Sequence, residues 1–468
     1  MSENNTSYEL EKNPFETENI GKLIMKFAIP CVISLVVNSL YNIVDQIFIG
    51  QGVGFLGNAA TNVAFPLVTI SMAFALLLGD GCAAYLSLKL GAGNRDSAAR
   101  GVGNTLSMLG IAGLFFLIFG LVLMKPLLYL FGATEVVMPY AVSYTSVIII
   151  GLPFVIMGTG LNSIIRADGS PKFAMVSMLV GAALNTILDP IFIFVFDMGV
   201  FGAAVATIIG QIATFCISFC YIKRFKNIQF TPELLKIKSS VAKTVIAFGA
   251  SSFIIQMAIT LVVIVMNNTL SYYGAMSVYG SEIPLSALGI VMKVNQILMS
   301  VLIGIAAGSQ PIIGYNYGAG NYERVKKTYL ISVSIATGCA LIGFCMFIFF
   351  PQSIINVFGQ EEALYNQFAL KCFRIFLMMC ALNGFQIVSS TFFQAIGKPV
   401  KAAALSLSRQ ILFLIPMLIV LPKIFGVEGA LYSGPVADFA AFLLAAFFIA
   451  HEMRNLNTSI SRTSQREV

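Results

Sequence analysis

The chain has 468 residues, of which 58% are hydrophobic and only 10% are charged, and its formal net charge is +7. A soluble domain is usually about half apolar and about a quarter charged, so this composition excludes an ordinary soluble protein and indicates a polytopic membrane protein. The positive charge does not indicate a nucleic-acid partner, because the lysines and arginines gather in the short segments between apolar runs.

Twelve apolar segments are long enough to cross a membrane as helices, which requires roughly 20 residues for a core about 30 Å thick. They cover residues 23–50, 58–89, 98–122, 139–165, 173–196, 201–222, 244–272, 284–315, 328–350, 365–394, 402–421 and 429–451. Basic residues gather in every second loop, whereas the loops between them hold little beyond Lys125 and Lys423, and this asymmetry predicts that both termini are cytoplasmic. We therefore expect a multi-pass membrane protein.

The second half of the chain repeats motifs of the first half at an offset of 227 or 228 residues. The pairs are "GAGNRDSAAR" at 91–100 with "GAGNYERVKK" at 318–327, "RADGSPK" at 166–172 with "QAIGKPV" at 394–400, and "GVFGA" at 199–203 with "GVEGA" at 426–430. Each half has six spans, so both halves have the same orientation. Such parallel repeats occur in transporters, where a pseudo-two-fold axis along the membrane normal relates the two lobes.

The predicted fold is therefore all-α, with two six-helix lobes and a cleft between them that suits transport by alternating access. The predicted parts are a cytoplasmic tail (1–22), an N-lobe (23–222), a cytoplasmic linker (223–243), a C-lobe (244–451) and a second cytoplasmic tail (452–468). The basic linker follows the positive-inside rule, and it is also a candidate contact for anionic lipid headgroups.

Polar residues interrupt three apolar spans of the first half at the three- and four-residue spacing of one helix face. They are Asn38, Tyr41, Asn42 and Asp45 on the first span, Asn185 and Asp189 on the fifth, and Thr207 on the sixth. At ~1.5 Å per residue from the nearest basic side chain, Asp45, Asp189 and Thr207 lie about 28, 26 and 24 Å deep. Residues distant in sequence should therefore meet at one level of the N-lobe.

Two neighbouring carboxylates in a low dielectric cannot both stay ionised without a cation. The constellation predicts a site for a coupling ion, H⁺ or Na⁺, to which Asn185 and Thr207 add neutral oxygens. The alternative is that Asp45 and Asp189 each cap or hydrogen-bond their own helix. In the second half, Lys293 and Asp438 have similar predicted depths, which predicts an ion pair that is either structural or a proton-linked switch.

The chain resembles the multidrug and toxic compound extrusion (MATE) family, and in particular its MepA/DinF-like bacterial branch. The resemblance extends from about Gly21 to His451, and three motifs carry it: "FAIPCVISLVVNSLYNIVDQIFIG" on the first span, "RADGSPK" before the fifth span, and "LNTILDPIF". It implies the two-lobed MATE fold, a helix kink at Pro30 and an N-lobe Na⁺/H⁺ site. The implied site residues are Asp45, Asn185, Asp189 and Thr207, with Asn162 as a polar neighbour.

The resemblance also implies a secondary active antiporter that exports amphipathic, often cationic, organic compounds in exchange for H⁺ or Na⁺, without a cofactor and as a monomer. A NorM-like acidic residue on the tenth span is replaced here by Asn383, so the N-lobe site should carry ion coupling. The polar residues proposed to line the substrate cavity are Asn38, Tyr41, Asn42, Gln256 and Asn267.

Two other functions fit the sequence less well than export. A flippase for lipid-linked saccharides would share the architecture, but it would need several cationic residues deep in the cleft, where Lys293 is nearly alone. A membrane enzyme has little support, because the chain has one histidine, His451, and no metal-ligand cluster or phosphate-binding glycine loop.

Overall fold

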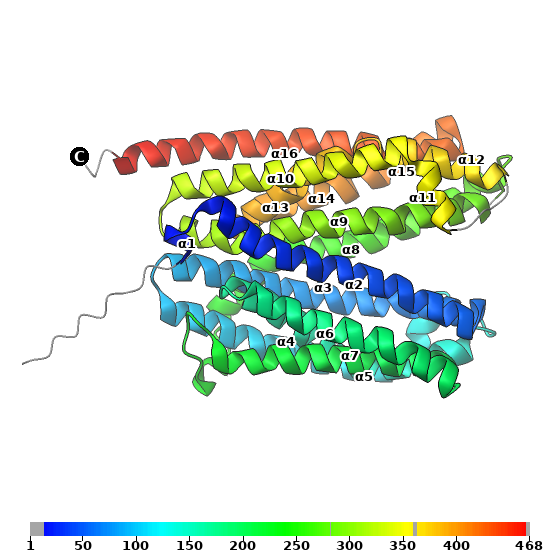
Figure 1. Cartoon of the computed structure of the whole chain (residues 1–468), viewed down its shortest axis with the longest axis horizontal. Coiled ribbons are helices and arrows are strands. Elements are labelled where there is room, and N and C mark those ends of the chain that lie inside the picture. Colours follow the sequence, from blue (N-terminus) through cyan, green and yellow to red (C-terminus); the bar gives the residue numbers. More distant parts are fainter. Residues whose placement is uncertain (1–13, 281, 359–362, 465–468) are drawn as a thin grey trace, which may run out of the picture.

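The structure is a computed structural model that describes residues 14–280, 282–358 and 363–464, and within these residues all regular structure is helical (Figure 1). The first half of the chain contains α1 (Pro14–Thr17), α2 (Ile20–Gly52), α3 (Phe55–Gly91), α4 (Arg95–Leu130), α5 (Met138–Ala167), α6 (Pro171–Pro190), the π-helix η1 (Ile191–Val195), α7 (Gly199–Cys220) and the 3₁₀ turns η2 (Tyr221–Arg224) and η3 (Pro232–Leu235).

The second half contains α8 (Ser239–Ala275), α9 (Glu282–Gly318), α10 (Tyr322–Phe349), α11 (Pro351–Phe358), α12 (Ala363–Lys371), the π-helix η4 (Cys372–Phe376), the 3₁₀ turn η5 (Cys380–Leu382), α13 (Asn383–Ala395), α14 (Pro399–Leu407), the π-helix η6 (Ser408–Leu414), α15 (Ile415–Phe425) and α16 (Val427–Ser464). In the described residues 11 helices are long and apolar enough to cross a membrane, and a bent pair brings the number of spans to 12. The predicted twelve spans are confirmed.

Two segments differ from the sequence-based prediction. The tenth span is broken, because Ala363–Phe376 and Cys380–Ala395 meet at an angle of 41° around a π-helix and a 3₁₀ turn. The predicted C-terminal tail is helical as far as Ser464. No glycine or proline interrupts the sequence between His451 and Ser464, so nothing in the chain ends the last helix at the membrane surface.

The helices form two lobes that lie one above the other in Figure 1, with α2–α7 in the lower lobe and α8–α16 in the upper lobe. The repeated "GAGN" motifs make equivalent turns in the two lobes. Gly93 and Gly320 have φ angles of 74° and 75°, which glycine adopts without a steric penalty. The next residues, Asn94 and Asn321, accept hydrogen bonds from backbone N–H groups of the helices that follow.

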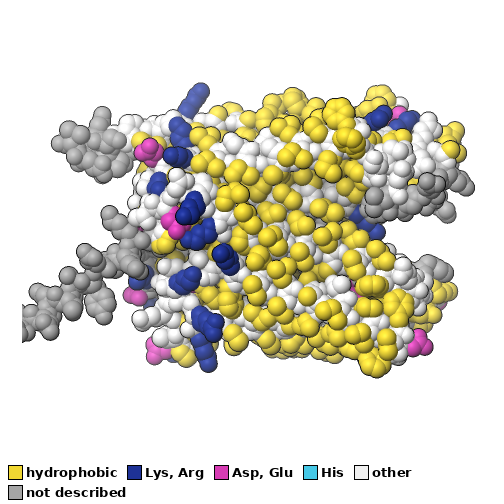
Figure 2. Space-filling view, in the orientation of Figure 1, with side chains coloured by type: hydrophobic (Ala, Val, Ile, Leu, Met, Phe, Trp, Pro, Cys, Tyr) yellow, Lys and Arg dark blue, Asp and Glu magenta, His cyan; other side chains and the backbone are white. Residues whose placement is uncertain are grey.

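The lobes touch closely at the end of the molecule where lysine and arginine side chains gather, here called the basic end. A Cβ atom on Gly249 of α8 would lie 1.7 Å from the Leu77 carbonyl oxygen of α3, and one on Gly81 would lie 2.1 Å from the Val245 carbonyl oxygen. Figure 2 shows the basic end at the left and a hollow between the lobes at the opposite, far end. The two lobes are thus closed together at the basic end and separated at the far end.

The segment before α2 crosses the basic end from one lobe to the other. The Phe15 ring lies 5.3 Å from the ring of Phe27 in α2 and 5.2 Å from that of Tyr315 in α9. The Tyr315 hydroxyl donates a hydrogen bond of 2.9 Å to Glu16, and the Arg324 guanidinium donates to the Phe15 carbonyl oxygen at 3.0 Å. The described part of the predicted tail therefore contributes to closure of the basic end.

The connection between the lobes is fixed to the N-lobe by the buried Asp168. Its carboxyl group accepts hydrogen bonds from the Tyr221 hydroxyl at 2.7 Å and from the backbone N–H groups of Lys226 and Asn227 at 2.8 and 3.1 Å. Burial raises the pKa of the Asp168 carboxyl, and these hydrogen bonds oppose the shift. The segment predicted as a linker is thus attached to one lobe along part of its length.

Candidate functional site

Three helices of the N-lobe bring polar side chains together inside the span region. Asp45 of α2 and Asp189 of α6 have carboxyl groups within hydrogen-bonding reach of each other. The Asn185 side-chain amide donates at 3.2 Å to Asp189 Oδ1 and at 3.2 Å to the hydroxyl of Thr207 in α7. These four residues, predicted from spacing and depth, lie in one cluster.

The cluster has buried acceptor oxygens that lack donors. Asp45 Oδ1, Asn185 Oδ1 and Asp189 Oδ2 have no hydrogen-bond partner among the described residues, and neither does the nearby Gln211 Oε1 of α7. A buried acceptor without a donor costs about 1–3 kcal/mol, and more if it is charged. A proton shared between the two aspartates, or a cation among these oxygens, would remove that cost.

Two tyrosines complete the surroundings of the aspartates. Tyr41 of α2 and Tyr144 of α5 lie near enough to interact electrostatically with both Asp45 and Asp189. Tyr41 was predicted only as a cavity residue, and Tyr144 was not predicted. The signal for Tyr144 was its four-residue spacing from Tyr140, which places both rings on one helix face.

Asn162 does not belong to the cluster, and its prediction as a polar neighbour is wrong. Its side-chain oxygen accepts a hydrogen bond of 2.9 Å from Ser177, which lies eight residues before Asn185 in α6. Eight helical residues correspond to about 12 Å of depth. Asn162 instead joins α5 to α6 nearer the basic end.

Comparison with known proteins identifies the family. The MatE family model matches residues 30–191 and 251–420 of the chain. The chain belongs to the MatE family.

Several proteins are similar to this MatE transporter over nearly its whole length. The multidrug export protein MepA of Staphylococcus saprophyticus is 26% identical over 451 residues, which cover 94% of this chain and 96% of that protein. A ligand-bound structure of the MATE multidrug transporter DinF-BH is 36% identical, covers 94% of this chain and 97% of that one, and has a TM-score of 0.87. An outward-facing MATE transporter of the MOP superfamily shares the fold at a TM-score of 0.88, with 22% identity and coverage of 95% and 98%. The predicted two-lobed, all-α MATE fold is confirmed.

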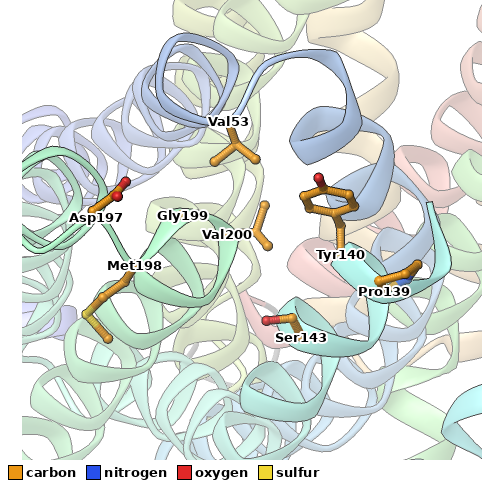
Figure 3. Close-up of a pocket in the computed structure, with 8 residues that line it drawn as sticks. All are labelled: Val53, Pro139, Tyr140, Ser143, Asp197, Met198, Gly199 and Val200. Atoms are coloured by element: carbon orange, nitrogen blue, oxygen red, sulfur yellow. The ribbon is translucent and has the colours of Figure 1, made fainter. Parts of the chain in front are cut away.

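A pocket of about 310 Å³ lies at the far end of the N-lobe (Figure 3). Val53 after α2, Tyr140 and Ser143 of α5, and Val200 of α7 surround it. Tyr140 is one helical turn from Tyr144, so the pocket and the cluster share α5 as a wall.

The other residues predicted from the resemblance occupy α2 and α8. Pro30 lies inside the continuous helix α2, where its carbonyl oxygen accepts a hydrogen bond of 2.7 Å from Ser34. Asn38, Tyr41 and Asn42 follow in the same helix, next to the contact at 2.7 Å between the hydroxyls of Ser39 and Ser300, which joins the two lobes. Gln256 is half-buried and Asn267 is exposed, both in α8.

The C-lobe contains a different ion pair from the one predicted. Arg409 Nε donates to Asp438 Oδ1 at 2.7 Å, and Asn383 also hydrogen-bonds the Asp438 carboxyl. The prediction that Asp438 pairs with Lys293 is wrong. Residue counting estimates the depth of a side chain but not its direction around the helix axis. Arg409 lies in the π-helix η6, which packs directly against α16.

Removal of one member of this C-lobe pair should be more harmful than removal of both. Arg409→Met is expected to lower the free energy of unfolding in detergent by about 3–5 kcal/mol, because it leaves the Asp438 charge buried without its partner. The double variant Arg409→Met/Asp438→Leu is expected to recover most of this loss. A double variant as unstable as the single one would contradict a paired-charge role.

Proposed function

We propose that this MatE transporter is a secondary active antiporter that exports amphipathic, often cationic, organic compounds in exchange for H⁺ or Na⁺. The observation that carries the proposal is the pair of facing carboxyl groups, Asp45 and Asp189, with acceptor oxygens that lack donors. Asp189 is fully buried, whereas Asp45 is half-buried. An ion that enters past Asp45 would be enclosed between the two aspartates and the oxygens of Asn185 and Thr207.

The basic end faces the cytoplasm in this proposal, following the positive-inside rule. The arrangement closed at the basic end is then the state that releases the compound outside and takes up the coupling ion. The helix α2 carries Asp45, the cavity residues Asn38 and Asn42, and Ser39 of the lobe contact. Ion binding at Asp45 can therefore alter both the cavity and the lobe contact through a single helix.

The substrate class is supported by the relatives. MepA is a multidrug export protein and DinF-BH is a multidrug transporter. The chain has 39 phenylalanines and 20 methionines, and such adaptable apolar side chains suit a cavity that accepts compounds of several shapes. We propose that the protein acts as a monomer, because both the cluster and the cavity residues come from one chain.

Transport of a fluorescent cationic dye into inverted membrane vesicles tests this function. The vesicles are given a pH gradient, a Na⁺ gradient or neither, with no ATP. Dye accumulation is expected only with one or both gradients, and the gradient that supports it identifies the coupling ion. Accumulation that is equal in all three conditions would contradict antiport.

A further inference from the structure

A partly buried acid, separate from the ion cluster, lies between the lobes near the basic end. Asp80 of α3 has one carboxyl oxygen, Oδ1, that accepts a hydrogen bond of 2.7 Å from Ser163 in its own lobe. Its other oxygen, Oδ2, accepts a hydrogen bond of 2.8 Å from Ser252 of α8, in the opposite lobe. Arg166 lies 3.9 Å from Oδ1 and also donates to Ser163.

The C-lobe side of this contact is itself held in place. The side-chain amide of the buried Gln394 in α13 donates to the Ser252 hydroxyl at 3.2 Å and to the Phe248 carbonyl oxygen at 3.0 Å. Ser252 thus accepts from Gln394 and donates to Asp80, so its hydrogen atom is directed at the acid. A hydrogen bond to a charged acceptor is stronger than one between neutral groups.

The close approach of α3 and α8 explains why these side chains meet. The backbones touch at Gly81 and Gly249, where a Cβ atom would lie 2.1 Å or less from a carbonyl oxygen of the facing helix. The two helices run in opposite directions, and helical side chains tilt toward the N-terminus of their own helix. Asp80 and Ser252 therefore lean toward each other. A ring pair, Phe74 with Phe253 at 5.2 Å, joins the same two helices.

The acid is not required by the repeated architecture. At the offset of 227 residues that relates the "GAGN" turns, the position equivalent to Asp80 is Ala307. At the offset of 228 that relates "RADGSPK" to "QAIGKPV", Arg166 is equivalent to Gln394. An acidic residue inside a membrane span is costly, so its presence in only one lobe calls for a role of its own.

We propose that Asp80, Ser252 and Gln394 form a lock that sets the balance between the closed and open states of the basic end. This proposal rests on the alternating-access function proposed above. Asp80 Oδ1 keeps its donor, Ser163, in either state, whereas Oδ2 has its donor only when the lobes meet. Opening of the basic end must break the Ser252–Asp80 hydrogen bond, while Arg166 remains beside the acid to balance its charge.

The test measures a distance between the lobes at the basic end. Asp96 and Glu323 are equivalent, exposed residues in the first turns of α4 and α10, so Asp96→Cys and Glu323→Cys can carry a pair of spin labels. The exposed cysteines Cys216, Cys220 and Cys345 are replaced by alanine in this background. Ser252→Ala is expected to increase the ratio of long to short distances about tenfold, as loss of one hydrogen bond to a charged group predicts.

Ser163→Ala is the matched control. Like Ser252→Ala, it removes a serine hydroxyl that donates a hydrogen bond to the Asp80 carboxyl group. Ser163 and Asp80 belong to the same lobe, so the substitution is expected to leave the distance ratio unchanged. An unaltered ratio of long to short distances in Ser252→Ala would overturn the proposed lock. A shift of this ratio in Ser163→Ala equal to that in Ser252→Ala would also overturn it. The distances are recorded without substrate or an ion gradient, so this result stands apart from the outcome of the gradient-driven transport assay.

Discussion

Replacement of Asp45 or Asp189 by asparagine is expected to reduce gradient-driven dye transport to the level of vesicles without the protein. Asparagine keeps the shape of aspartate and therefore the packing of α2 and α6. It removes one of the two charges that hold the coupling ion, and its amide cannot take up a proton in the working range of pH. The ion gradient then has no site through which to act on the lobes. The measurement is the initial rate of dye accumulation in inverted vesicles under the gradient that drives the unsubstituted protein.

Asp197→Asn is the matched control for this experiment. Asp197 is exposed at the far end of the N-lobe, where it lines the pocket of Figure 3 and does not belong to the cluster, and it has a φ angle of 52°. Asparagine tolerates this backbone conformation well, so the substitution should fold and transport normally. Undiminished gradient-driven transport by both Asp45→Asn and Asp189→Asn would eliminate the cluster as the coupling site.

Addition of a single methyl group at Gly249 should also have a large effect on dye export. Its carbon would lie 1.7 Å from the Leu77 carbonyl oxygen, so α3 and α8 must move apart. Overpacking usually costs about 1–3 kcal/mol, and a difference of about 3 kcal/mol between two states changes their ratio roughly 150-fold. Gly249→Ala is therefore expected to disfavour closure of the basic end and to stop dye export. The label pair at positions 96 and 323 should report the longer distance.

Gly289→Ala provides the comparison, because a Cβ atom there would have no atom within 4 Å. Gly289 lies inside α9, where alanine is favoured over glycine by about 1 kcal/mol. This variant should close and transport like the unsubstituted protein. Export by Gly249→Ala at the unsubstituted rate would show that the contact with Leu77 is not needed for closure.

Features that depend on position along one helix were predictable from the sequence. Apolar length predicted the spans, and the offset of the motifs predicted the two lobes. Depth and helix face together predicted that Asp45, Asn185, Asp189 and Thr207 would meet, and the structure places them together. Each of these inferences uses only the rise and the turn of an α-helix.

Features that depend on direction around the helix axis were not predictable. The partner of Asp438 was misassigned because residue counting placed Lys293 at the depth of Asp438 and Arg409 nearer the basic end, and such counting ignores the length and direction of a side chain. Arg409 also lies in η6, and a π-helical turn contains more residues than an α-helical one, so it rotates the side chains that follow. Asp80 had no predicted role, because its partner, Ser252, is an ordinary serine 172 positions away.

The Arg409–Asp438 pair has a consequence for the electrical balance of the transport cycle. A guanidinium stays charged and cannot leave the protein, so this pair adds no exchangeable charge of its own. Under the proposed exchange, the stoichiometry is then limited to the one or two ions that Asp45 and Asp189 hold. Exchange of one proton for a monovalent cationic compound would be electroneutral. Exchange of two would be electrogenic, and the membrane voltage would contribute about 2.3 kcal/mol per 100 mV to each cycle.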